Sequence, residues 1–217
     1  MISGPSSCGK STFIENFPLR KVGFPSENLP VFFPNKLLRQ DSPGDYQNAI
    51  LHYNILRPYP LYDESRSDQY VKNGYNKYIK KLTSFLWKNK QQHHSWEELK
   101  SAWDYQRDPF FAYLNKLEIQ LKVIVLVANK DLIKQRMRKR SLLEERRFSD
   151  SERPYPRSYW LNILNQLDLL DVYNIWLNFL QQNQIEYQLH NSNTMEYEQL
   201  NSPDDIVKIL YGEKHAM

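Results

Sequence analysis

A short glycine-bounded string near the start of the 217-residue chain fixes more of its architecture than any other segment: Gly4-Pro5-Ser6-Ser7-Cys8-Gly9-Lys10-Ser11-Thr12. The two glycines let the backbone turn back without a Cβ in the way, so successive N–H groups face one concavity. A short helix follows the string and ends before Pro18, because proline cannot continue a helix interior. Only Met1 to Ser3 precede the string. We therefore expect either a very short first strand or a chain that is a fragment or later start of a longer protein.

The same string matches the pattern G-x-x-x-x-G-K-[ST], the phosphate-binding loop known as Walker A. Lys10 supplies a mobile positive charge for the β- and γ-phosphates of a nucleotide, and the Ser11 hydroxyl is suited to Mg²⁺. The helix that begins there points its positive dipole end at the same phosphates. The predicted cofactors are ATP and Mg²⁺, with Ser11 as the metal ligand. The predicted nucleotide-binding residues are Gly4, Ser6, Ser7, Cys8, Gly9, Lys10, Ser11 and Thr12.

The rest of the chain alternates apolar strands with helical patterns. Leu121–Val127 is the clearest strand, because its β-branched density is typical of a buried parallel strand. Strands alternating with helices predict an α/β fold: a three-layer sandwich with a parallel sheet and right-handed crossovers. Ligands in such sheets bind at the carboxyl ends of the strands. Further strands are predicted at 31–33, 49–53 and 185–189. The carboxyl ends of the strands should bring three segments around one cleft: residues 4–12, 52–57 and 129–131.

We predict one domain over residues 1–217. A helical region at about 64–118 includes an aromatic-rich helix at 64–90, which is the expected wall of an acceptor pocket, and a further helix at 109–117. Later helices are predicted at 131–140, from about 157 through Leu180, and from Ser202, as N-cap, to Gly212. A mobile charged lid is predicted at about 141–156.

Arg136 and Arg140 stand four residues apart after the Leu121–Val127 strand, so they share one helix face. Two guanidinium groups near a triphosphate can hold phosphate oxygens and stabilise a phosphoryl group in transfer. The alternative is an ordinary solvated basic face within the stretch Lys130–Arg157, which has ten basic and five acidic residues.

With these motifs the chain resembles the nucleotide, nucleoside and other small-molecule kinases of the P-loop superfamily. The stretch from Val123 to Glu145 is similar to the lid region of deoxynucleoside kinases. The resemblance implies a P-loop kinase-like fold with a helical and lid insertion, and transfer of the ATP γ-phosphoryl group to a small-molecule acceptor. It also implies catalytic roles for Lys10, Arg136 and Arg140. Looser lid candidates are Arg146, Arg147 and Arg153.

One expected residue is absent from this pattern. Such kinases place a carboxylate at the end of an early strand, where this chain has Leu51-His52-Tyr53-Asn54. His52 is a candidate base if its pKa lies near neutral, or else a hydrogen-bonded histidine at a strand end. Asn54 and Arg57 are candidate acceptor contacts, Arg57 either for an anionic acceptor or as a surface arginine.

Three other functions stay open. Asn129-Lys130-Asp131 approaches the guanine-reading N-K-x-D motif of a GTPase, but its carboxylate comes one residue early. A catalytically degenerate nucleotide-binding protein would explain the missing carboxylate. A nucleic-acid-binding module using the basic stretch is less favoured, since nearby Trp160 is in phase with a helix core.

Composition adds few constraints. The net charge of +4 is compatible with many partners, and a single cysteine excludes an internal disulfide. No apolar run approaches the roughly 18 residues that span a bilayer, and no signal peptide is visible. We therefore expect a cytoplasmic protein with no membrane partner; the sequence does not reveal its oligomeric state.

Overall fold

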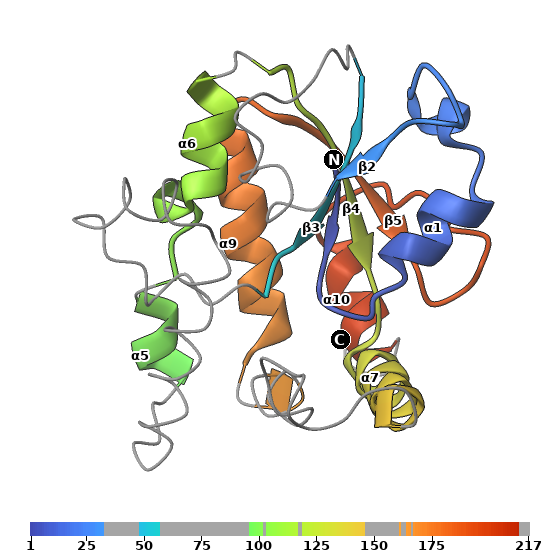
Figure 1. Cartoon of the computed structure of the whole chain (residues 1–217). Helices are drawn as coiled ribbons and strands as arrows, with labels where there is room; N and C mark the ends of the chain where they lie inside the picture. The colour runs from blue at the N-terminus through green and yellow to red at the C-terminus, as the bar shows by residue number, and fades with distance from the viewer. Residues whose placement is uncertain are drawn as a thin grey trace.

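Five parallel strands form one sheet in the order β2-β3-β1-β4-β5 (Figure 1). The computed structural model describes residues 1–32, 48–56, 96–101, 103–116, 119–145, 161, 164–165 and 167–212. The all-parallel α/β prediction is confirmed. The strands are β1 (Ile2–Gly4), β2 (Val31–Phe32), β3 (Ile50–Asn54), β4 (Lys122–Val127) and β5 (Glu186–Asn191).

The short lead-in before the glycine string does form a strand, and that strand is the centre of the sheet. Ile2 pairs with His52 of β3 on one side and with Ile124 of β4 on the other. The Met1 amino group donates a hydrogen bond to the Lys122 carbonyl, and the Ile124 amide donates to the Met1 carbonyl at 2.8 Å. Neighbours on both edges therefore hold a strand that is too short to be stable by itself.

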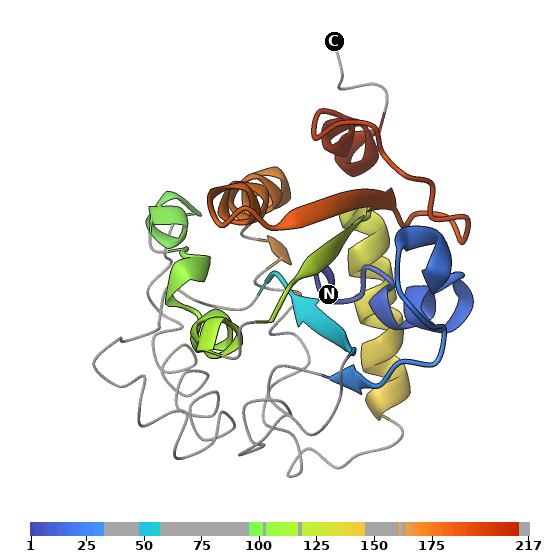
Figure 2. The same cartoon turned by 90° about the horizontal axis from the view of Figure 1, so that it is seen from above.

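Helices cover both faces of this sheet, with α6 and α9 on one face and α1 on the other (Figure 2). The face with α9 is tied to the central strands by polar contacts as well as by packing. The Trp176 indole donates to the Ser3 hydroxyl at 3.1 Å, and the Tyr173 hydroxyl donates to the Leu126 carbonyl at 2.8 Å. The described helices are α1 (Lys10–Asn16), α5 (Trp96–Ser101), α6 (Pro109–Lys116), α7 (Lys130–Glu145), α9 (Leu169–Gln182) and α10 (Asp205–Tyr211).

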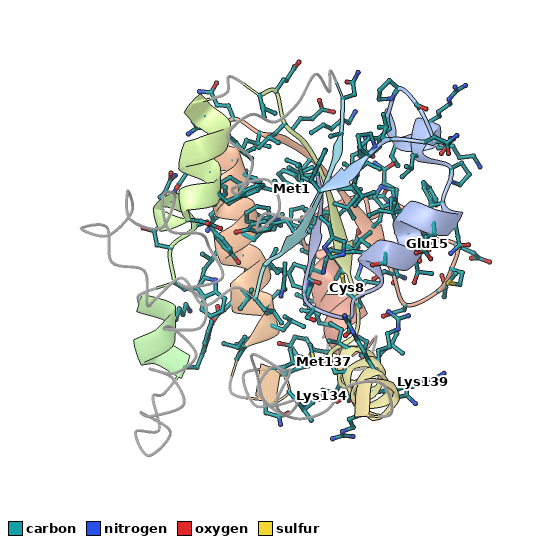
Figure 3. The ribbon with its side chains drawn as sticks, in the orientation of Figure 1. Met1, Cys8, Glu15, Lys134, Met137 and Lys139 are labelled. Atoms are coloured by element: carbon teal, nitrogen blue, oxygen red, sulfur yellow. The ribbon has the colours of Figure 1, made fainter. Side chains whose placement is uncertain are left out.

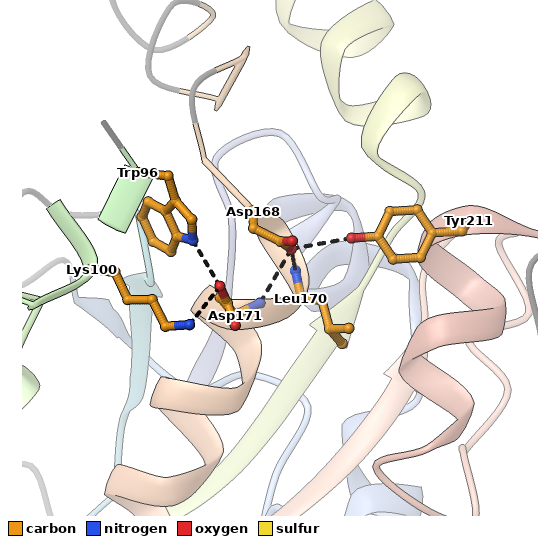
Figure 4. A network of polar contacts seen from close by, with 6 residues as sticks. All are labelled: Trp96, Lys100, Asp168, Leu170, Asp171 and Tyr211. Atoms are coloured by element: carbon orange, nitrogen blue, oxygen red, sulfur yellow. Dashed lines mark hydrogen bonds and ion pairs between the residues drawn. The ribbon is translucent and has the colours of Figure 1, made fainter. Parts of the chain in front are cut away.

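The predicted continuous helix up to Leu180 is wrong, because α9 begins only at Leu169. Asp168 is its N-cap: the carboxylate accepts from the Leu170 amide at 2.9 Å and the Asp171 amide at 3.4 Å (Figure 4). A side chain that satisfies the first free amides starts a new helix. Asp171 in turn accepts from the Trp96 indole and the Lys100 ammonium, which ties α5 to α9.

Two other helix boundaries also differ from the prediction. Helix α7 continues to Glu145, so residues 141–145 are helical and not the start of a loop. Helix α10 begins at Asp205 with Asp204 as its N-cap residue, whereas the Ser202 hydroxyl accepts a turn hydrogen bond from the Asp204 amide at 3.2 Å.

Several predicted features lie outside the described residues: the aromatic helix at 64–90, Arg57, and residues 146–156 of the predicted lid with Arg146, Arg147 and Arg153. In the part of the chain that is described, no helix is both long and apolar enough to span a membrane.

Candidate phosphate-binding site

The glycine-bounded loop lies at the carboxyl edge of the sheet, directly after the central strand. Gly4, the last residue of β1, pairs with Asn54 at the end of β3. Val127 and Asn191 pair at the ends of β4 and β5. Because all strands are parallel, the segments that follow them meet at this edge, where α7 also lies (Figure 1). Figure 3 labels Cys8 at this end of the sheet and Met1 at the other.

The loop backbone has the positive φ angles that a concave turn requires. Gly4 has a φ of 147°, Ser7 63° and Gly9 106°. A Cβ added at Gly4 would lie 2.7 Å from the Cys8 sulfur and 2.8 Å from the Leu126 carbonyl oxygen. Both the conformation and the space at position 4 therefore require glycine.

Lys10 lies folded across this loop. Its ammonium donates to the carbonyls of Gly4 at 2.9 Å and Pro5 at 2.6 Å, and it lies 3.8 Å from the Cys8 sulfur. The residue is only 4% exposed. Burial lowers the pKa of Lys10, and the charge of Arg140 acts in the same direction. A buried ammonium beside further cations is a place where an anion lowers the electrostatic energy.

The Cys8 side chain contributes little chemistry here. Its thiol is buried, and burial raises the pKa of Cys8, which keeps the thiol protonated. A contribution of Cys8 to ligand binding would therefore come from its backbone and not from its thiol. Of the other loop residues, Ser6, Ser7 and Thr12 are half-buried, and Ser11 is exposed at the first turn of α1.

The two arginines of α7 have different surroundings. Arg136 donates from Nη1 to the Cys8 carbonyl and from Nη2 to the Ser192 carbonyl, both at 3.2 Å. Arg140 is more exposed, and its charge lowers the pKa values of Lys10 and His52. The structure therefore brings Lys10, Arg136, Arg140 and His52 to one edge, with Arg136 bound to the protein backbone.

His52 was a candidate general base on the condition that its pKa lies near neutral, and its pKa is well below that. Its pKa is lowered to about 4, first by burial and then by the charges of Lys10 and Arg140. At neutral pH the imidazole is therefore uncharged and only weakly basic. The neighbouring candidate Asn54 accepts a hydrogen bond at its Oδ1 from the Leu56 amide at 3.1 Å.

The guanine-like triplet has a structural role in this fold. The Asn129 Oδ1 accepts from the Asp131 amide at 2.9 Å, and its Nδ2 donates to the Leu210 carbonyl at 2.9 Å. The Lys130 ammonium donates to the Leu167 carbonyl at 2.6 Å. The Asn129 side chain thus caps the first turn of α7, and both side chains bind backbone carbonyls of other segments. These contacts argue against recognition of a guanine base.

Sequence reasoning missed Ser192, which follows β5. Its hydroxyl donates to the Cys8 carbonyl at 2.7 Å, and its amide donates to the Val127 carbonyl at 2.8 Å. A lone serine after a strand has no sequence signal that distinguishes it from other serines. Only the fold brings it to the loop.

A separate hollow of about 940 Å³ lies at the opposite edge of the sheet. Its lining includes Met1, Lys122 and Glu186, which precede or begin strands. It is therefore distinct from the glycine-bounded loop.

No protein-family model matches this chain, and no curated protein matches it at a significant level.

Proposed function

We propose that this protein is a kinase that binds ATP with Mg²⁺ and transfers the γ-phosphoryl group to a small-molecule acceptor. The proposed fold is the three-layer, P-loop kinase-like sandwich. The observation that carries the proposal is the loop after β1, over which the Lys10 ammonium folds while two arginines of α7 lie at the same edge.

The loop residues fit a nucleotide triphosphate. Gly9 has a φ of 106°, which L side chains rarely adopt, and it has no Cβ to cover the loop amides. Backbone amides can therefore approach phosphate oxygens closely. The N-cap residue of α1 is Gly9, which has no side chain that could cap the first amides of the helix. In the proposed complex these amides and Lys10 hold the β- and γ-phosphates.

Mg²⁺ is proposed to enter with the nucleotide. The part of the chain that the structure describes has no group of three His, Cys, Asp or Glu side chains suited to a metal of its own. The exposed Ser11 hydroxyl is the proposed protein ligand. The ion would neutralise phosphate charge during transfer.

The proposed catalysis is mainly electrostatic. Phosphoryl transfer passes through a loose transition state that depends on positioning and charge stabilisation more than on proton abstraction. Lys10 and Arg140 supply that positive charge. A neutral His52 suits this scheme as a hydrogen-bonding group for an acceptor hydroxyl, since its pKa is about 4.

The test is a screen of ATP consumption across nucleosides, sugars and small alcohols. We expect one class to stimulate turnover, and Lys10→Ala to lower it by about 10- to 100-fold, because charge-assisted hydrogen bonds are lost. Lys139→Ala is the matched control, since it removes an exposed positive charge from α7 (Figure 3).

Three results would overturn the kinase proposal. Turnover that Lys10→Ala leaves unchanged would place the chemistry elsewhere. Binding of guanine nucleotides alone would favour a GTPase. Binding of ATP without turnover on any acceptor would favour the degenerate nucleotide-binding alternative.

A further inference from the structure

The Cys8 carbonyl is held by two side chains from distant parts of the chain. The Ser192 hydroxyl donates to it at 2.7 Å and Arg136 Nη1 donates to it at 3.2 Å. Ser192 is 1% exposed and follows β5, whereas Arg136 lies on α7. Arg136 Nη2 also donates to the Ser192 carbonyl at 3.2 Å, so Arg136 contacts both residues. The Val127 carbonyl is a second acceptor for the Ser192 hydroxyl at 3.1 Å, and the Cys8 carbonyl at 2.7 Å is the nearer one.

Holding this carbonyl fixes the next amide. The Cys8–Gly9 peptide bond is trans, because the described residues contain no cis peptide bond. In a trans peptide the C=O and N–H vectors point in opposite directions. The Gly9 N–H must therefore point away from Ser192 and Arg136. Without such contacts, a glycine at φ 106° could adopt other peptide orientations at little cost.

We propose that Ser192 and Arg136 are positioning residues that aim the Gly9 amide at a bound phosphate group. This inference rests on the proposed nucleotide site and adds to it the residue pair that preorganises the loop. Donors fixed before the ligand arrives cost no reorganisation on binding. Arg136 then acts mainly on the loop, and contact with the transferring group falls to Arg140.

The single cysteine makes this peptide directly observable. The chain has one Cys, so a protein labelled with ¹³C-carbonyl cysteine and ¹⁵N-glycine gives one correlated signal, that of Cys8–Gly9. We expect Ser192→Ala to move the Cys8 carbonyl shift upfield, because a hydrogen bond to the carbonyl is lost. Ser192→Thr keeps a hydroxyl and should restore the shift. Ser202→Ala is the matched control, since the Ser202 hydroxyl contacts the Asp204 amide instead.

A second experiment measures the binding of ATP with Mg²⁺ and, separately, of inorganic triphosphate. In the wild type each should shift the Gly9 amide proton downfield. Ser192→Ala should weaken both affinities by about tenfold, the loss expected when one hydrogen bond to an anion is misdirected. Ser192→Thr and Ser202→Ala should stay within about twofold. Urea unfolding of each variant identifies any general loss of structure.

The outcomes separate the two proposals. An unchanged carbonyl shift in Ser192→Ala would overturn the carbonyl contact even if ATP binds. Triphosphate binding that leaves the Gly9 amide unshifted would overturn its role as a phosphate donor. A carbonyl shift that depends on Ser192, without any binding of ATP or triphosphate, would overturn the proposed function and with it the positioning role.

Discussion

Gly4 is the position where the loop geometry makes its sharpest quantitative prediction. Its φ of 147° is one that side chains of L-residues rarely adopt. In Gly4→Ala the new methyl would lie 2.7 Å from the Cys8 sulfur and 2.8 Å from the Leu126 carbonyl oxygen, both well short of the 3.4 Å at which ordinary contact begins. Neither neighbour moves easily, because Cys8 is fully buried and the Leu126 oxygen belongs to β4.

The expected cost has two parts. Forcing an L-residue into a positive φ costs about 1–2 kcal/mol. Overpacking a close-packed site adds about 1–3 kcal/mol. We therefore expect Gly4→Ala to lower the free energy of unfolding by about 2–5 kcal/mol, a large share of a typical total of about 5–15 kcal/mol.

Urea unfolding followed by circular dichroism measures this loss, and Gly212→Ala is its matched control. Gly212 has a φ of 78°, yet no atom of the described residues lies within 4 Å of a Cβ placed there. The control should therefore lose only the conformational part, about 1–2 kcal/mol. Adding Cys8→Ala to Gly4→Ala removes one of the two close contacts and should return about 0.5–3 kcal/mol as coupling energy. Equal losses in Gly4→Ala and Gly212→Ala would refute the crowding argument.

Two further predictions concern a helix cap and a histidine. Asp168→Ala should cost about 0.5–2 kcal/mol by urea unfolding, since its carboxylate caps α9. The control Asp204→Ala should cost under about 0.5 kcal/mol, because the Asp204 side chain makes no cap hydrogen bond on α10. Similar losses of stability in Asp168→Ala and Asp204→Ala would contradict the capping argument. The pKa of His52 falls from 6.5 to about 4 on folding, so the unfolded state binds more protons between these values. The stability from neutral His52 is complete above pH 6.5 and is lost as pH falls towards 4. The lowered pKa of His190 acts in the same direction, so the wild type is compared with His52→Gln. The free energy of unfolding of His52→Gln should fall less as the pH is lowered across this range. Equal falls in the two proteins would contradict the lowered pKa of His52.

The strands could be predicted because their signals are local. β-branched residues in β4 and the strand–helix alternation were enough to place β2, β3, β4 and β5 and to infer a parallel sheet. The order of the strands was not predicted, since it depends on which strands pair along their edges in the folded sheet. The centre of the sheet is Ile2–Gly4, too short to stand out by periodicity and held by hydrogen bonds to β3 and β4.

The errors at helix boundaries have physical causes. Apolar periodicity continues across Leu167 and Leu170, but the Asp168 carboxylate offers the next amides a cap and starts a new helix. The charged residues from position 141 onward suggest a mobile lid, but leucine and glutamate favour helix and α7 runs through residues 141–145.

The candidate site was predictable where it depended on spacing and not where it depended on tertiary contact. The string from Gly4 to Thr12 and the four-residue step from Arg136 to Arg140 are visible in the sequence. Ser192 contacts Cys8 across 184 positions, so only the arrangement of β5 beside β4 brings it to the loop.

The four-residue step suggests two equivalent arginines, but burial makes them different. Arg136 is half-buried and donates to two backbone carbonyls, so moving it onto a phosphate would leave the Cys8 and Ser192 carbonyls with fewer donors. Arg140 lies one turn further on and is more exposed, yet its charge acts on both Lys10 and His52. Within the proposed mechanism, the charge that follows the transferring phosphoryl group is therefore that of Arg140, while Arg136 preserves the loop that receives the nucleotide.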